Sequence, residues 1–131
     1  MSESPAYQVV RGIVSAVVKD TESPAGGTVS LANLPLPTTG YFVGGAVPEL
    51  VFESFVTVNG PKIVEFVESA PSRYVEWWVD TETGRVHVDA VNWYQEEFAA
   101  GAIARARGEL AVWDIARNRE LRLAYVDGER A

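Results

Sequence analysis

Apolar residues near the start of the chain follow the spacing of one helix face. Ser4 and Pro5 favour a helix start, because serine can accept hydrogen bonds from free backbone amides and proline is pre-set for the first helical position. The residues that then recur at i, i+3, i+4 and i+7 are Ala6, Val9, Val10, Ile13, Ala16 and Val17. This pattern predicts a helix to about Lys19. The many β-branched residues leave a strand beginning near Tyr7 as the alternative.

Turn-forming residues divide the next forty positions into short elements. Residues 21–27 are rich in turn formers and are expected to end the first element. We predict strands at 28–31, 40–43 and 50–58, with two prolines in the loop between the first two. A helix is then expected over residues 61–69, capped by Asn59. Its expected buried residues are Ile63, Val64, Phe66 and Val67.

The most regular alternation lies in the second half of the chain and predicts a β-hairpin. Residues 74–80 and 85–91 flank a polar turn that contains Gly84. If Asp80 lies opposite Arg85, one side of the hairpin is apolar. That side carries Val75, Trp77, Val79, Val86, Val88 and Ala90. The other side carries Tyr74, Glu76, Trp78, His87 and Asp89, and we expect it to face water, with Trp78 opposite His87 and Glu76 opposite Asp89.

A third helix and a second hairpin complete the predicted order. Asn92 and Gln95 resemble a capping box, and Gly108 is a natural residue to follow a helix end. The expected buried stripe of this helix is Phe98, Ala99, Ala102, Ile103 and Ala106. Strands are expected at 110–115 and 120–126, and residues 127–131 are expected to fray. The order predicts a single α+β domain over residues 1–131, a mostly antiparallel sheet with about three helices packed on one face.

Composition narrows the function classes. The 131 residues include no cysteine and one histidine, which excludes thiol chemistry, disulfides and multi-histidine metal sites within the chain. A net charge of −7 argues against general binding to nucleic acids or to anionic membranes. We find neither a signal sequence nor an apolar run long enough for a membrane span, so a cytoplasmic location is expected. No cofactor and no resident metal are expected.

One group of residues suggests catalysis. His87, Asp89 and Glu76 are predicted on one hairpin side, where two carboxylates and an imidazole could act as base and orienting group or hold a divalent metal. The alternative is a solvated sheet face laced with cross-strand pairs. The chain contains no GxSxG, GxGxxG or GxxxxGK[ST] motif, which argues against a serine nucleophile and against a phosphate-binding loop.

The aromatic residues suggest binding. Trp77 and Trp113 fit core positions, whereas Trp78 and the Trp93–Tyr94 pair are expected at the surface, where large aromatic side chains can anchor a partner. The alternative is that a helix or a second copy covers them. Basic residues gather in the last third, and Arg117 and Arg119 are candidates for partner contact.

Our leading hypothesis is a non-enzymatic accessory protein that binds a protein partner or forms a homodimer. The alternatives are a small metal-assisted or carboxylate-based hydrolase centred on His87 and Asp89, and a small-molecule binding domain. In the last case the pocket would lie between the sheet and a helix starting near Trp93.

Four segments also resemble a group of small uncharacterised proteins of actinobacterial genomes, plasmids and phages. The segments are GGTVSL, PTTGYFVGG, WVDTETGRVHVDAV and ARARGELAVWDIA. In that group the third segment typically reads W-x-D-x-x-T-G-x-V-x-x-D, and the fourth is a helix that leads into an A-x-W-D strand. The resemblance implies an α+β fold and an accessory role in a phage or mobile element. It implies no catalytic residue.

Overall fold

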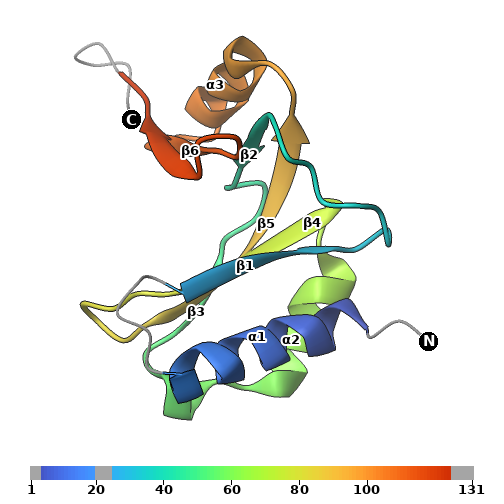
Figure 1. Ribbon diagram of the computed structural model, residues 1–131, viewed down its shortest axis with the longest axis vertical. Helices are drawn as coiled ribbons and strands as arrows, with labels where there is room; N and C mark the ends of the chain where they lie inside the picture. Colours follow the sequence, from blue (N-terminus) through green and yellow to red (C-terminus); the bar gives the residue numbers. More distant parts are fainter. Residues whose placement is uncertain (1–3, 20–24, 125–131) are drawn as a thin grey trace.

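The computed structural model describes residues 4–19 and 25–124. Within these ranges three α-helices pack on an antiparallel sheet of seven strands, which confirms the predicted α+β fold (Figure 1). The helices are α1 (Pro5–Lys19), α2 (Gly60–Ser69) and α3 (Glu97–Ala106). The strands are β1 (Ala25–Ser30), β2 (Tyr41–Val43), β3 (Leu50–Phe52), β4 (Tyr74–Val79), β5 (Val86–Tyr94), β6 (Ala111–Asp114) and β7 (Arg119–Arg122).

The first element is a helix, as its apolar spacing predicts. The Ser4 hydroxyl oxygen accepts a hydrogen bond from the Tyr7 amide at 3.2 Å, as expected for a residue that caps a helix. Ala6, Val9 and Ile13 are buried in the main core. The spacing of the apolar residues therefore predicted the element correctly, although its valines would also suit a strand.

Strand β5 organises the sheet. The strand order is β1-β4-β5-β2-β6-β7, and β3 also pairs with β5. Along one edge of β5, β3 lies opposite residues 86–88 and β2 lies opposite residues 92–94. The three β5 residues between them, 89–91, face the six-residue connection 44–49. The ladder is thus interrupted midway along β5.

This interruption separates two halves that share β5. The α1–α2 half contains α1, α2, β1, β3, β4 and the first part of β5, whereas the α3 half contains α3, β2, β6, β7 and the end of β5 (Figure 1). Val86 and Val88 point into the core beneath α1 and α2, and Tyr94 packs in the core beneath α3. Because even-numbered side chains of one strand share a side, the helices lie on one face of the sheet.

Two predictions between β3 and α2 are wrong. Residues 50–58 do not form one strand, because β3 ends at Phe52 and a 3₁₀ turn follows at Phe55–Thr57. The Thr57 hydroxyl group closes this turn by donating to the Ser54 carbonyl at 2.8 Å and accepting from the Ser54 amide at 3.2 Å. In α2, Asn59 caps the helix as predicted, but Val64 is exposed because Ile63 and Val67, one turn apart, face the core.

The predicted start of the third helix is also wrong, and so is its predicted buried stripe except for Ile103, which packs partly buried against the core. β5 continues through Tyr94, so Asn92 lies in a strand, and Glu96 is the residue that precedes α3. The buried residues of α3 are Ala100 and Ala104. The helix begins four residues later than a cap at Asn92 would place it, and Phe98 is 89% exposed because Ala100 and Ala104 are the residues that face the core.

The end of α3 and the hairpin that follows it agree better with the sequence predictions. Gly108 follows α3 with a φ of 74°, as a helix-ending glycine should. β6 and β7 form the second predicted hairpin, although residues 125–131, including the expected frayed end, lie outside the described residues. No helix in the described ranges is both long enough and apolar enough to cross a bilayer.

Candidate functional site

The register of the β4–β5 hairpin is the one predicted. Trp78 pairs with His87 and Glu76 with Asp89, and the Asp80 amide donates to the Arg85 carbonyl at 2.8 Å. The predicted apolar side is buried apart from Val79, which is partly buried. The opposite side does not simply face water, because Tyr74 and Asp89 are each only 9% exposed. The predicted solvated face is therefore partly an interior one.

His87 is engaged within this face. Its ring stacks on Trp78 with the centroids 4.7 Å apart and the planes 3° from parallel. Its Nδ1 lies 3.1 Å from Oε1 of Glu49, in the segment before β3. Trp78 is therefore a half-buried neighbour of His87 rather than the exposed anchor that the sequence suggested.

Asp89 occupies the place where the β5 ladder is interrupted. Its carboxylate accepts a hydrogen bond from the backbone N–H of Ala90, and Oδ1 is enclosed without a hydrogen-bond partner among the described residues. Burial, followed by the negative charges of Glu49 and Glu109, raises the pKa of Asp89 to about 7, against the opposing effect of Arg107. Gly44 lies so close that a methyl group there would meet the Asp89 carboxylate.

Glu76, opposite Asp89 on β4, shares this behaviour. Burial raises the pKa of Glu76 to about 7, and the nearby charge of Asp89 adds to the shift. Because burial makes both carboxylates costly to ionise, both groups are partly protonated near neutral pH. We call these two residues the carboxyl pair.

Arg107 joins the carboxyl pair region to the α3 half. Its guanidinium group donates to the carbonyls of Val43 at 3.4 Å and Gly44 at 3.1 Å, and to Oδ1 of Asn92 at 2.9 Å. Next to it, burial and the charge of Glu49 raise the pKa of Glu109, and Arg107 lowers it. The end of α3 is thus fixed to β2 and β5 by one cation.

The predicted catalytic set is brought together only in part. Glu76 and Asp89 are neighbours, but His87 is directed to Glu49. Among the described residues no three histidine or acidic side chains are arranged to hold a metal. Pockets of about 480 and 460 Å³ open elsewhere, and neither is lined by the carboxyl pair.

The second group of candidate residues lies on the sheet face away from α3. Phe42 of β2 pairs with Trp93 of β5 on one side and with Trp113 of β6 on the other. Directly paired residues share a side of the sheet, so these three rings form an aromatic row. Phe42 is 5% exposed, whereas Trp93 and Trp113 are each 37% exposed. The prediction that Trp113 belongs to the core is wrong, because Val112 is the β6 residue that packs beneath α3.

Trp93 is held in place. Its indole N–H donates to the Thr39 carbonyl at 2.9 Å. Gly40, with a φ of 87°, lets the main chain approach the indole closely, and a side chain at Gly40 would collide with it. An exposed aromatic ring that is already fixed loses little entropy when it contacts a partner.

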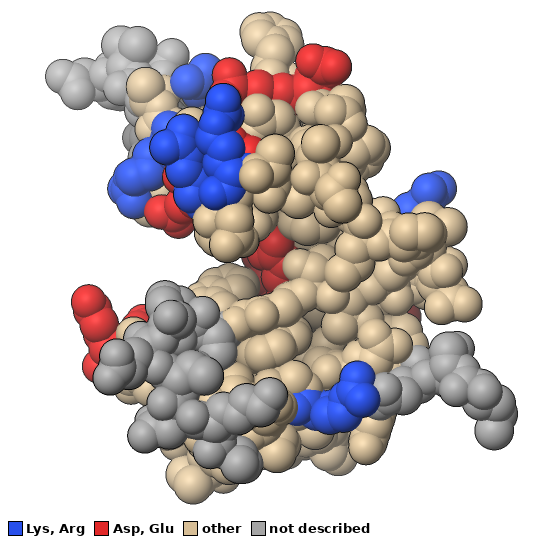
Figure 2. Space-filling view, viewed as in Figure 1, with Lys and Arg blue, Asp and Glu red and all other residues tan. Residues whose placement is uncertain are grey.

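Basic residues gather beside the α3 half. Figure 2 shows a group of Lys and Arg atoms near the β6–β7 end of the molecule, with acidic atoms among them. Arg117 donates to Oδ2 of Asp114 at 2.9 Å, which lowers the pKa of that buried carboxyl group. Arg119 pairs with Asp114 in the β6–β7 ladder and is exposed, as is Arg122. Arg117 therefore has a structural partner, and Arg119 is the freer of the two predicted contact residues.

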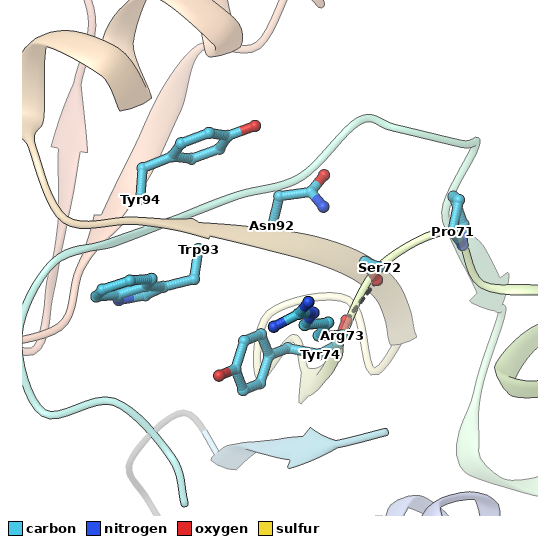
Figure 3. A pocket seen from close by; sticks show the side chains of 7 residues that line it. All are labelled: Pro71, Ser72, Arg73, Tyr74, Asn92, Trp93 and Tyr94. Atoms are coloured by element: carbon cyan, nitrogen blue, oxygen red, sulfur yellow. Dashed lines mark hydrogen bonds between the residues drawn. The ribbon is translucent and has the colours of Figure 1, made fainter. Parts of the chain in front are cut away.

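A pocket of about 480 Å³ lies at the edge of β5 (Figure 3). Trp93 and Tyr94 leave β5 on opposite sides, and Arg73 and Tyr74 lie on the Trp93 side. The remaining lining residues are Pro71, Ser72 and Asn92. The pocket thus opens at a strand edge and not between the sheet and a helix, where a small-molecule site was expected.

Most residues of this site could not be predicted from the sequence. Glu49, Glu109, Arg107 and Arg73 carry no local motif, and the alternation of β5 beyond Val91 was the one available signal for the aromatic row. Comparison with protein-family models, with curated proteins and with solved structures finds no match to the chain.

Proposed function

We propose that this protein is a non-enzymatic binding module whose aromatic row contacts a partner protein. The observation that carries the proposal is the exposure of two tryptophans, one on each side of Phe42, on a sheet face that α3 leaves uncovered. Tryptophan is among the residues that contribute most to binding energy at protein interfaces. Burying both rings would remove from water apolar surface that folding leaves exposed.

The partner surface that fits is largely apolar. On β7, Glu120 pairs with Trp113, and Nη1 of Arg122 lies 3.9 Å from Oε2 of Glu120 on the same side of the sheet. Arg119 pairs with Asp114 on the α3 side, so the row is bordered by charges of both signs. Complementary charge on a partner would speed association and orient the complex. A second copy of this acidic chain is the less favoured occupant.

The carboxyl pair gives weaker support to a hydrolase. Its raised pKa values would suit proton transfer, but the two pockets lie elsewhere. An accessory role in a phage or mobile element fits a binding module and is part of the same proposal.

The test compares variants of the aromatic row with a matched exposed aromatic. Trp113→Ala removes one row residue, and Phe98→Ala removes a ring that is 89% exposed on α3, outside the row. Proteins captured by the wild type are identified, purified and titrated against each variant by calorimetry. We expect Trp113→Ala to weaken binding at least about tenfold, as loss of an interface tryptophan usually does. Phe98→Ala should change the affinity less than about twofold.

Two outcomes count against the proposal. Equal affinities of the wild type and Trp113→Ala for every purified partner would remove the row from the interface. Sedimentation that shows a tryptophan-dependent dimer would assign the row to a second copy of the chain.

A further inference from the structure

We propose that the pocket at the edge of β5 receives an extended acidic peptide, which adds as a strand beside Trp93 and places a carboxylate on Arg73. This inference rests on the proposed function of protein binding and names the form of the bound segment.

The open edge of β5 follows from the ladder. β4 begins at Tyr74, opposite Val91, so residues 92–94 have no strand on the β4 side. On the other side they pair with β2. For these three residues β5 therefore presents a sheet edge inside a pocket.

The direction of the free backbone groups can be derived from two hydrogen bonds. The Asp80 amide donates to Arg85, so the odd-numbered β5 residues direct their N–H and C=O groups toward β4. The Ile115 amide donates to Gly40, so Phe42 turns its groups toward β6 and away from its partner Trp93. Both bonds agree that the N–H and C=O of Trp93 point to the open edge. An added strand would pair with both.

The walls of the pocket suit alternating side chains. In Figure 3, Asn92 and Tyr94 lie on one side of β5, and Trp93, Tyr74 and Arg73 lie on the other. Successive residues of an added strand point to opposite sides. One set would contact Tyr94, and the other set would meet Trp93 and Arg73. Backbone pairing with side-chain pockets on both sides is the usual mode of peptide recognition by strand addition.

Arg73 selects the charge of the peptide. It is exposed, it lines the pocket, and no described residue forms an ion pair with its guanidinium group. It is also the one charged residue among those that line the pocket. A carboxylate is the complement that an arginine fork binds best in a peptide.

The terminal strand β7 offers a useful contrast. Arg119, Glu120 and Arg122 are all exposed along it, and charged residues on an edge strand discourage strand addition. The β5 edge is flanked by aromatic rings instead. Strand addition is therefore expected at β5 and not at β7.

The test selects binders from a displayed library of random seven-residue peptides. The strongest one is synthesised, both unmodified and with single N-methyl groups along its backbone, and is titrated against the wild type, Arg73→Gln and Trp113→Ala. We expect the selected peptides to share an acidic residue. Arg73→Gln should weaken binding about tenfold, and N-methylation at the position that donates to Trp93 should do at least the same. Amide exchange of Trp93 should slow in the complex.

The controls separate this inference from the proposed function. Trp113 does not line the pocket, so Trp113→Ala should leave peptide affinity within about twofold while weakening the protein partner. Three results would overturn the proposed strand addition. The selected peptides could lack acidic residues, they could bind equally well with every N-methyl group, or the library could yield no binder. If protein binding through the row persists in that case, only this inference fails. Circular dichroism of Arg73→Gln checks that the variant is folded.

Discussion

The two halves of the molecule place their large side chains differently. The α1–α2 half buries Trp77, Phe52 and two isoleucines between the helices and the sheet. The α3 half packs Ala100 and Ala104 against two valines and leaves two tryptophans at the surface. Large buried side chains contribute most to stability, and large exposed ones contribute most to binding. One half therefore supplies most of the buried core, and the other carries the surface that we propose for recognition.

The largest expected difference between the halves comes from their tryptophans. Trp77 is buried, and its indole lies between Gly12 of α1 and Gly27 of β1. Trp77→Ala should lower the free energy of unfolding by roughly 3 to 5 kcal/mol, because it leaves a cavity in the main core. Trp113→Ala should cost about 1 kcal/mol or less. Urea unfolding of both variants measures the contrast, and equal losses would contradict the division of roles.

Asp89, at the boundary between the halves, is expected to make the stability of the protein depend on pH. The folded protein raises the pKa of Asp89 from 3.8 to about 7, so it favours the protonated form. Its contribution to stability is therefore complete below the unfolded pKa and is lost as pH rises through about 7. Asp89→Asn removes this titration and keeps an acceptor for the Ala90 amide.

Relative to the wild type, Asp89→Asn should gain roughly 1 to 3 kcal/mol of stability between pH 5 and pH 8. Taking the difference between the two proteins cancels groups such as Asp114, whose lowered pKa acts in the opposite direction. Urea titrations at four pH values measure this difference. A constant difference across the range would show that Asp89 does not titrate near neutrality, and Glu120→Gln, at an exposed site, is the control.

The smallest difference concerns the helix starts. Asn59 accepts a hydrogen bond from the Lys62 amide at 3.1 Å, whereas Glu96 forms no side-chain cap for α3. Asn59→Ala should cost about 1 kcal/mol, and Glu96→Ala should cost only a few tenths. Thermal unfolding of the two variants decides whether α2 depends on its cap more than α3 does.

Much of the fold could be predicted because its signals are local. The stripe of α1, the Asn59 cap and the alternation of the β4–β5 hairpin each specify an element within a few residues. The start of α3 could not be predicted, because Asn92 and Gln95 resemble a capping box although β5 continues through Tyr94. The prediction that Trp113, and not Val112, faces the core was also wrong. Asp114, on the Val112 side, is an unexpected buried residue that Arg117 neutralises.

The candidate site was less predictable, since tertiary contacts create it. Asp89 was identified, but its unusual environment depends on Glu49 and Glu109, which are brought near it by the connection 44–49 and the end of α3. Trp93 was identified as an exposed aromatic, whereas Tyr94, also expected at the surface, packs partly buried in the core beneath α3. Their position on an open strand edge follows from where β4 begins. The alternation of polar and apolar residues does not predict that position.

The position of β2 also sets the order in which the protein can assemble. β2 pairs with β5 and β6, whose residues lie about fifty and seventy positions later in the chain. Contacts between such distant segments form slowly, because a long loop must close first. During synthesis β2 therefore waits for its final neighbour until most of the chain has been made. The aromatic row, completed by Trp113, is among the last features to form, so a newly made chain acquires the surface that we propose for recognition only when folding is nearly finished.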